Sequence, residues 1–320
     1  KVLLGLFAQI KRLYDVGFTE KTVPVWHPDV RYFELSQNGT HIGGVYMDLY
    51  AREGKRGGAW MNDYKGRRRL PDGQLQSPTA YLVCNFTPPA AGKEARLSHD
   101  EILTLFHETG HGLHHLLTQV DELGVSGING VEWDAVELPS QFMENFVWEY
   151  DVLRGMSEHE DNGAPLPQEL FDKMLAAKNF QRGMFLVRQM EFALFDMLIY
   201  SETDPARLAG WAQVLDSVRR EVAVVQPPAY NRFANSFGHI FAGGYSAGYY
   251  SYAWAEVLSA DAYAAFEESG NVAECGRRFW QEILAVGGSR SAAESFQAFR
   301  GRSPSIDALL RHSGFDLNAA

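Results

Sequence analysis

Two histidines four residues apart are the first feature of this sequence that could do chemistry. His107 and His111 stand in Leu-Phe-His-Glu-Thr-Gly-His-Gly-Leu-His-His, residues 105–115. On a helix this spacing puts both imidazoles on one side, one turn apart, as two corners of a metal site. Glu108 follows about 100° further round the helix, where it can accept a proton from water that the metal activates. The spacing predicts a metal-dependent hydrolase.

The histidines need a helix, and the surrounding residues predict one from about 99 to 119. Ser98 and Glu101 have the form of a capping box, and apolar residues recur at helical spacing after them. This pattern predicts that one face of the helix packs, while the face with His107, His111 and His114 carries the chemistry. The alternative is a solvated helix face with polar residues and no metal. The residues predicted to pack are Leu105, Leu113, Leu116 and Val120.

A third metal ligand is needed, because a catalytic zinc site usually has three protein ligands and a water. Glu132, next to the glycine-rich loop at 124–130, could serve. Glu137 lies where a further helix, predicted for about 134–150, begins, and it would share a face with Gln141 and Glu144. A capping box between Asp134 and Glu137 is the competing explanation for that carboxylate. The residue types alone leave these possibilities open.

A second stretch that could do chemistry is rich in glycine, tyrosine and histidine and spans residues 237–252. Gly243 and Gly244 allow positive φ and close approach of another backbone. Tyrosine and histidine side chains supply donors that could stabilise the oxyanion formed in peptide hydrolysis. The alternative is an aromatic cluster that packs the core, with the glycines only turning the chain.

The elements that must position these residues predict a mainly helical α+β fold in one domain, residues 1–320. A helix at 2–14 precedes strands at 31–35, 42–50 and 79–86, which predict a small, mostly antiparallel sheet within about 29–88. Residues 67–77 are predicted to form a polar segment that leaves the sheet. An edge of this sheet beside the histidine helix could hold an extended peptide.

From residue 98 onward the pattern is helical. Later helices are predicted near 170–200, from 204–205, and at 249–268, 272–285, 291–299 and 305–311.

Composition excludes several classes of protein. Of the 320 residues, 46% are hydrophobic and 22% charged, which is ordinary for a globular chain, and the net charge of −11 argues against nucleic acid or an anionic membrane as partner. No apolar run is long enough to span a membrane, and no signal peptide is apparent. Cys84 and Cys275 are too few for a disulfide framework and favour a reduced, cytoplasmic protein. The chain starts inside a helical pattern at Lys1, so we expect sequence upstream.

Three blocks of this sequence resemble the thimet-oligopeptidase family of zinc peptidases. They are Phe-His-Glu-Thr-Gly-His-Gly-Leu-His at 106–114, Val-Ser-Gly at 125–127 and Trp-Asp-Ala-Val-Glu-Leu-Pro-Ser-Gln-Phe-Met-Glu-Asn at 133–145. The resemblance implies a zincin-like domain with one Zn²⁺ held by His107, His111 and Glu137. The family usually has Phe where Thr109 stands, at a position facing away from the metal.

The glycine- and tyrosine-rich stretch is similar to the substrate-binding loop of the same family. This likeness implies that Tyr252 donates to the oxyanion and that His239 and Tyr245 contact the substrate or transition state. It also makes Tyr249, Gly243 and Gly244 substrate-binding residues.

The resemblance implies an endopeptidase acting on short peptides, with Glu108 as general base. The family normally has a large helical N-terminal half, absent here, onto which this chain would dock. One alternative is a dipeptidyl carboxypeptidase with the same site. Another, from a different class, is a metal-dependent peptide-binding module without catalysis.

Overall fold

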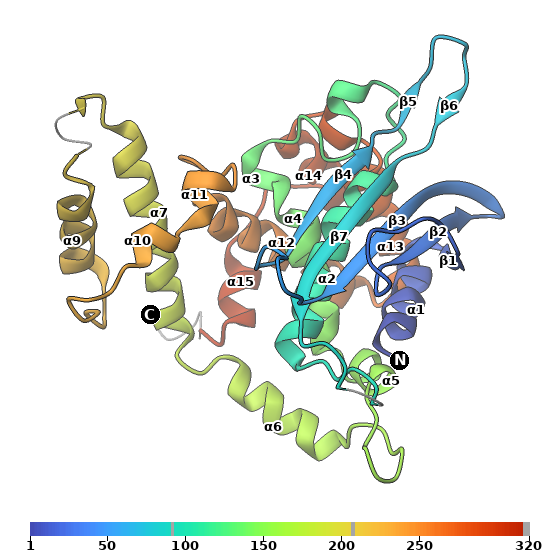
Figure 1. The fold of residues 1–320 in the computed structure, drawn as a ribbon, viewed down its shortest axis with the longest axis horizontal. Coiled ribbons are helices and arrows are strands. Elements are labelled where there is room, and N and C mark those ends of the chain that lie inside the picture. The colour runs from blue at the N-terminus through green and yellow to red at the C-terminus, as the bar shows by residue number, and fades with distance from the viewer. Residues whose placement is uncertain (91–92, 206–208, 316–320) are drawn as a thin grey trace.

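The computed structural model describes residues 1–90, 93–205 and 209–315, and it has the predicted α+β architecture. Helix α1 (Val2–Tyr14) packs below a small sheet, and helices make up most of the remaining chain (Figure 1). No helix among the described residues has the length and apolar character needed to cross a membrane.

The sheet contains the predicted strands and two further ones. Its order is β1-β2-β3-β7-β4; β3 and β7 run parallel, and the other neighbours are antiparallel. The predicted polar segment at 67–77 forms a small hairpin of β5 and β6. Strand β4 is the edge next to β7. The bounds are β1 (Val16–Lys21), β2 (Arg31–Gln37), β3 (Thr40–Tyr50), β4 (Trp60–Lys65), β5 (Arg68–Arg69), β6 (Leu75–Gln76) and β7 (Thr79–Phe86).

Helix α2 (His99–Leu116) carries the two histidines and lies against β7, β4 and β3. Its capping box is formed, because Glu101 N–H donates to the Ser98 hydroxyl and the Glu101 carboxylate accepts from Ser98 N–H. The helix ends three residues before the predicted end. Nearly all of it after Phe106 is buried, including His114 at 2% exposure. Leu105, Leu113 and Leu116 are buried as predicted, and later helices also pack against the face that carries the histidines.

The single helix predicted at about 134–150 is divided into short pieces. Helix α3 (Trp133–Val136) ends before Glu137, and α4 (Leu138–Glu144) begins just after it, with Pro139 in its first turn. Proline has no N–H and restricts the residue before it, so the chain changes direction here. Two further pieces follow, a 3₁₀ turn (Asn145–Trp148) and α5 (Tyr150–Met156). Glu137 thus lies at a break between helices.

Four helices after residue 165 form a part of the molecule that we call the arm: α7, α9, α10 and α11. The arm has a small hydrophobic core of its own. Figure 1 shows the arm at the left, away from the sheet. The pattern predicted as one helix at 170–200 is two, because Gln181 takes a left-handed conformation between them. The helix predicted from 204–205 lies partly outside the described residues. The bounds are α6 (Gln168–Lys178), α7 (Arg182–Ser201), α9 (Trp211–Val222), α10 (Phe233–Ser236) and α11 (Gly238–Ala242).

The last helices return to the main core. Helix α12 packs against α3 and α4, and α13 packs against α1. A stretch predicted as helix to residue 285 becomes a π-helical turn at Trp280–Leu284. The main core joins these helices to α1, α2 and the inner face of the sheet. The bounds are α12 (Ser251–Ser269), α13 (Val272–Phe279), α14 (Ala292–Arg300) and α15 (Asp307–His312).

Candidate metal centre

The imidazoles of His107 and His111 converge on one carboxylate, that of Glu137. Their Nε2 atoms lie 3.2 Å and 3.1 Å from the same Glu137 oxygen, Oε2. One ligand atom from each of the three residues lies within 4.8 Å of the others, and they form the one such group found among the described residues. Two imidazoles and a carboxylate are a common donor set of catalytic zinc sites.

Glu137 reaches the histidines because α4 packs closely on α2. Gly110 makes this approach possible, since a Cβ built on it would lie 2.3 Å from the backbone oxygen of Pro139. Glu137 is fully buried, and its carboxylate accepts hydrogen bonds from the hydroxyls of Ser140, at 2.9 Å, and Tyr245. The backbone approach and these donors fix the carboxylate over the two histidines.

The alternatives to Glu137 are not supported by the geometry. Glu132 is exposed at the start of α3 and is not part of the three-residue group. The capping box between Asp134 and Glu137 does not form, because Glu132 is the N-cap of α3 and Asp134 instead accepts a hydrogen bond from Tyr250.

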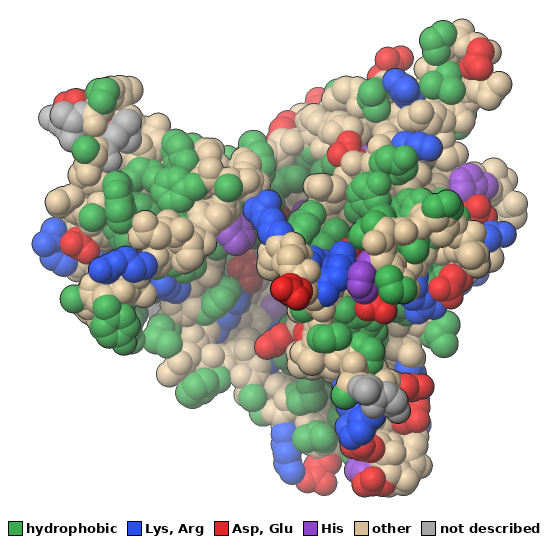
Figure 2. Space-filling view, viewed as in Figure 1, with side chains coloured by type: hydrophobic (Ala, Val, Ile, Leu, Met, Phe, Trp, Pro, Cys, Tyr) green, Lys and Arg blue, Asp and Glu red, His purple; other side chains and the backbone are tan. Residues whose placement is uncertain are grey.

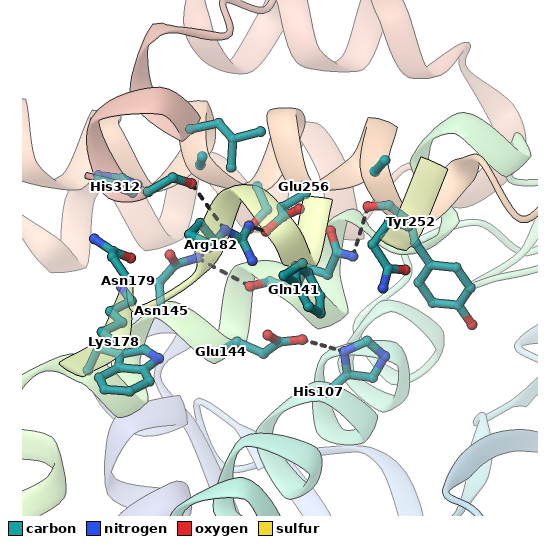
Figure 3. A pocket seen from close by; sticks show the side chains of 18 of the residues that line it. His107, Gln141, Glu144, Asn145, Lys178, Asn179, Arg182, Tyr252, Glu256 and His312 are labelled. Atoms are coloured by element: carbon teal, nitrogen blue, oxygen red, sulfur yellow. Dashed lines mark hydrogen bonds and ion pairs between the residues drawn. The ribbon is translucent and has the colours of Figure 1, made fainter. Parts of the chain in front are cut away.

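Glu144 holds the outer side of His107. Its Oε1 atom lies 2.6 Å from His107 Nδ1, which leaves Nε2 directed toward Glu137 (Figure 3). A carboxylate on the far ring nitrogen fixes the tautomer and orientation of a metal-binding histidine. Gln141, expected to be the other polar neighbour of Glu137, instead donates to the backbone oxygen of Tyr252. It thereby ties α4 to α12.

Glu108 is a buried carboxyl group beside the cluster. It is 5% exposed, and its Oε2 atom has no hydrogen-bond partner within the part of the chain that the structure describes. Burial raises the pKa of Glu108, although the neighbouring histidines oppose the shift. A carboxylate with a raised pKa and a free oxygen is suited to taking up a proton. Thr109, which follows it, donates to the Leu105 backbone oxygen of its own helix.

The charge on Glu137 is strongly stabilised. Burial by itself would raise the pKa of Glu137, but the charge of His111 and the hydrogen bonds from both imidazoles hold it well below its ordinary value. A carboxylate that stays ionised is ready to bind a cation.

The glycine- and tyrosine-rich loop brings the predicted residues together over this cluster. The ring of His239 lies 6.0, 5.7 and 5.9 Å from the rings of Tyr245, Tyr249 and Tyr252. The rings of Tyr245 and Tyr252 stack with their centroids 5.0 Å apart, and the Tyr245 hydroxyl donates to the Glu137 carboxylate.

The glycine- and tyrosine-rich loop packs against the arm and also contacts the three-residue group. Tyr245 and Tyr249 pack against the small core of the arm, while the Tyr245 hydroxyl reaches the metal cluster. Of the two glycines, Gly244 has φ +88° and therefore needs the freedom of glycine, whereas Gly243 ends α11. The loop is both a packing element and part of the site.

The matched sequence profile decides the family. The profile described as peptidase family M3 matches residues 1–315. The chain belongs to peptidase family M3. The resemblance to thimet oligopeptidases noted in the sequence is thereby confirmed.

Similar proteins refine the position of this M3 chain. Oligopeptidase A of Salmonella typhimurium is 55% identical over 317 residues, covering 98% of this chain and 47% of that protein. Oligopeptidase A of Escherichia coli is also 55% identical over 317 residues, covering 98% of this chain and 47% of that protein. Dipeptidyl carboxypeptidase of Escherichia coli is 35% identical over 323 residues, covering 98% of this chain and 46% of that protein. The chain spans about half the length of the curated relatives it matches.

Solved structures share the fold. PZ peptidase A with an inhibitor has a TM-score of 0.56 at 18% identity, covering 84% of this chain and 42% of that one. An M32 carboxypeptidase from Deinococcus radiodurans has a TM-score of 0.53 at 16% identity, covering 85% and 54%. The predicted α+β fold class is confirmed.

A cavity of about 380 Å³ opens beside the group of His107, His111 and Glu137. It extends from His107 along α4 and α12 to the end of α6 and the start of α7 (Figure 3). At its far end Lys178 makes a cation–π contact with Trp148, and no ion pair of Lys178 is found among the described residues. Arg182, beside it, is paired with Glu256.

Sequence reasoning missed three residues of this M3 site. The Ser140 hydroxyl donates to the Glu137 carboxylate. The ring centroids of Trp133 and Tyr245 lie 4.8 Å apart. Asp196 on α7 accepts hydrogen bonds from backbone N–H groups of the loop. Only Asp196 left a signal in the sequence, because an acid inside the apolar run Phe-Ala-Leu-Phe-Asp-Met-Leu-Ile is unusual for a helix that packs.

His114, expected on the same helix face as His107 and His111, is not one of the three residues that could hold a metal. It is 2% exposed, and neither ring nitrogen has a hydrogen-bond partner among the residues described. Burial lowers the pKa of His114 to about 3, so the ring is neutral.

Proposed function

We propose that this chain is the catalytic part of a zinc-dependent endopeptidase that hydrolyses short peptides. The observation that carries the proposal is the convergence of His107, His111 and Glu137. Beside them lies Glu108, whose buried Oε2 atom has no hydrogen-bond partner among the described residues. A protein that only bound peptides through a metal would not need a buried acid there, because burying an unpaired acid costs stability.

The residues fit a zinc ion. Two imidazole Nε2 atoms and one carboxylate oxygen face a common point, and His107 is oriented by Glu144. Zinc bound there would act as a Lewis acid toward the peptide carbonyl and lower the pKa of water. We propose one ion per chain.

Glu108 is proposed as the general base. Its free Oε2 atom would accept the proton of the attacking water and later deliver that proton to the leaving amine. The raised pKa caused by burial suits both steps, since the same group must take up and release a proton near neutral pH.

Tyr252 is proposed as the donor to the developing oxyanion, assisted by His239. The Tyr252 ring stacks on that of Tyr245, whose hydroxyl donates to Glu137, so Tyr252 lies beside the proposed metal ligands. Tyr245 and Tyr249 would contact the substrate, and Gly243 and Gly244 would let the loop adjust around it.

The substrate would lie in the cavity and along the sheet edge. Strand β4 has β7 on one side only, so its other edge can pair with an extended peptide beside α2. We expect short peptides, because the second wall supplied by the family's N-terminal half would close the channel. The free, buried thiols of Cys84 and Cys275 fit a cytoplasmic location.

The test combines metal analysis with peptide cleavage. The purified chain should bind one zinc ion and cleave internal bonds in a library of peptides of mixed length. Glu137→Gln should weaken zinc binding about 10- to 100-fold, the scale known for changes around a metal, whereas the matched control Glu132→Gln should leave it unchanged. Loss of zinc in the Glu132 variant alone would show that the wrong carboxylate was chosen.

Dipeptidyl carboxypeptidase activity is the second candidate. The observation that favours it is Lys178, which lines the cavity, has no ion pair within the described residues and could bind a peptide C-terminal carboxylate. Release of C-terminal dipeptides only, and failure to cut peptides with an amidated C-terminus, would identify this activity. Cleavage of amidated peptides at internal bonds would favour the endopeptidase.

A further inference from the structure

Asp196 is a buried acid that binds the backbone of the glycine- and tyrosine-rich loop. It lies on α7 with 0% exposure. Its two carboxylate oxygens accept the backbone N–H groups of Ala247 and Tyr249, each at 2.9 Å. These donors are about 50 residues away along the chain, so the contact joins the arm to the loop.

The partners of Asp196 are unusual for a buried charge. In the part of the chain that the structure describes, no Lys, Arg or His lies within ion-pair distance of it. Burying a carboxylate is costly unless hydrogen bonds compensate it, and here backbone amides provide them. The carboxylate and the loop conformation therefore depend on each other.

The loop adopts a strained conformation to make this contact. Ala247 has φ +53°, in the left-handed region that residues other than glycine rarely occupy. With Ala247 in this conformation, the N–H groups of Ala247 and Tyr249, on either side of Gly248, both face the Asp196 carboxylate. Strain of this kind persists only where the surroundings hold it, and Asp196 is the group that does so.

The loop carries the tyrosines of the proposed site on either side of this contact. Tyr245 precedes Ala247 by two residues and donates its hydroxyl to Glu137. Tyr249, whose own N–H is bound by Asp196, packs its ring 5.0 Å from that of Tyr252. A shift of the loop backbone would move all three rings relative to the metal ligands.

We propose that Asp196 is a positioning residue, which holds the 245–249 loop so that Tyr245, Tyr249 and Tyr252 face the metal centre. This inference rests on the proposed peptidase function. It assigns a role in the reaction to an acid that does not touch the substrate.

The test is Asp196→Asn, with Glu191→Gln as matched control. Both replace a buried acid of α7 by its amide, but Glu191 pairs with Arg219 and Arg188 and does not bind the loop. Asp196→Asn should lower kcat about 10- to 100-fold with KM changed much less, because misplacement of catalytic groups by about 1 Å costs this much. Glu191→Gln should lose stability with kcat retained, and both variants should still bind one zinc ion.

A second pair of variants approaches the same contact from the loop. Ala247→Val puts a β-branched residue at positive φ and should reproduce the kcat loss, whereas Ala247→Gly should keep wild-type kcat. The double variant Asp196→Asn with Ala247→Val should lose little more kcat than either single variant, since both substitutions disrupt the same interaction. Additive losses would overturn the proposal.

Hydrogen exchange of the loop amides separates this inference from the proposed function. In Asp196→Asn the N–H groups of Ala247 and Tyr249 should lose protection, while those of α2 keep it. If the amides are released and the wild-type chain cleaves no peptide, the peptidase function fails, but Asp196 still orders the loop. If the amides stay protected, or kcat does not change in an active enzyme, Asp196 does not position the site.

Discussion

At the scale of single residues, the two carboxylates proposed as metal ligand and as general base lie in opposite environments. Glu137 is surrounded by donors and its pKa is held low, whereas Glu108 is buried with a free oxygen and its pKa is raised. Two carboxylates in environments that shift their pKa values in opposite directions can take different roles in one reaction.

Replacing Glu108 tests this separation. Glu108→Gln keeps the three proposed ligands and removes the proton acceptor, so zinc should stay bound while kcat falls about 10²- to 10⁴-fold. Zinc content and steady-state kinetics on one peptide measure both effects. A variant with near wild-type kcat would mean that another group accepts the proton.

The two stacked tyrosines should differ in their effects. Tyr252→Phe should lower kcat roughly 10²- to 10³-fold with KM nearly unchanged, because the oxyanion contact is made in the transition state. Tyr245→Phe removes a hydrogen bond to Glu137 and should weaken zinc binding about 10-fold as well. Tyr250→Phe, which loses only a bond to Asp134, is the control on the same loop. A Tyr252→Phe variant that loses stability but keeps kcat would support a packing role alone.

At the scale of elements, the site depends on the distance between α2 and α4. A substitution that changes no ligand but separates these helices should therefore weaken the metal site. Gly110→Ala would bring a Cβ to 2.3 Å from the Pro139 oxygen, which is backbone and cannot turn aside. We expect a loss of about 1–3 kcal/mol in unfolding free energy, the usual cost of overpacking, together with weaker zinc binding.

Gly155→Ala is the matched control for that prediction. Gly155 lies in α5 with nothing within 4 Å of an added Cβ, so alanine should stabilise the helix slightly by its higher propensity. Denaturant unfolding with and without zinc compares the two variants. Equal zinc affinity in Gly110→Ala would show that the close approach does not set the geometry of the ligands.

At the scale of the whole molecule, the arm exposes apolar side chains over α7 and the segments around it. Phe180 is 77% exposed, Phe185 48% and Leu198 47%. Figure 2 shows apolar side chains gathered on the arm at the left of the view. Apolar surface of this kind commonly marks an interaction site.

We expect this surface to receive the N-terminal half of the family. The isolated chain should bind zinc, turn over peptides poorly and self-associate, because remote binding energy and ordering of the loop are lost. Adding the N-terminal half of an oligopeptidase A in trans should raise kcat/KM on short peptides and shift the chain to a defined complex in ultracentrifugation. A monomeric chain that already equals a full-length relative would contradict this expectation.

The sequence by itself determined what depends on neighbours along the chain. The spacing of His107 and His111 becomes a geometry as soon as the helix forms, and Ser98 with Glu101 starts that helix by local hydrogen bonds. Strands predicted at 31–35, 42–50 and 79–86 from their β-branched and aromatic residues are observed at 31–37, 40–50 and 79–86. These features were predictable because few long-range contacts are needed to fix them.

Only the tertiary structure decided how the separate pieces meet. The choice of Glu137 over Glu132 depends on a helix break at Pro139 and on the space that Gly110 leaves. The bond from Tyr245 to Glu137 joins residues 108 apart, and the Asp196 contacts span 51 and 53 residues. Local propensity cannot specify such contacts, because they form only when α2, α4, α7 and the loop pack together and exclude water from the carboxylates.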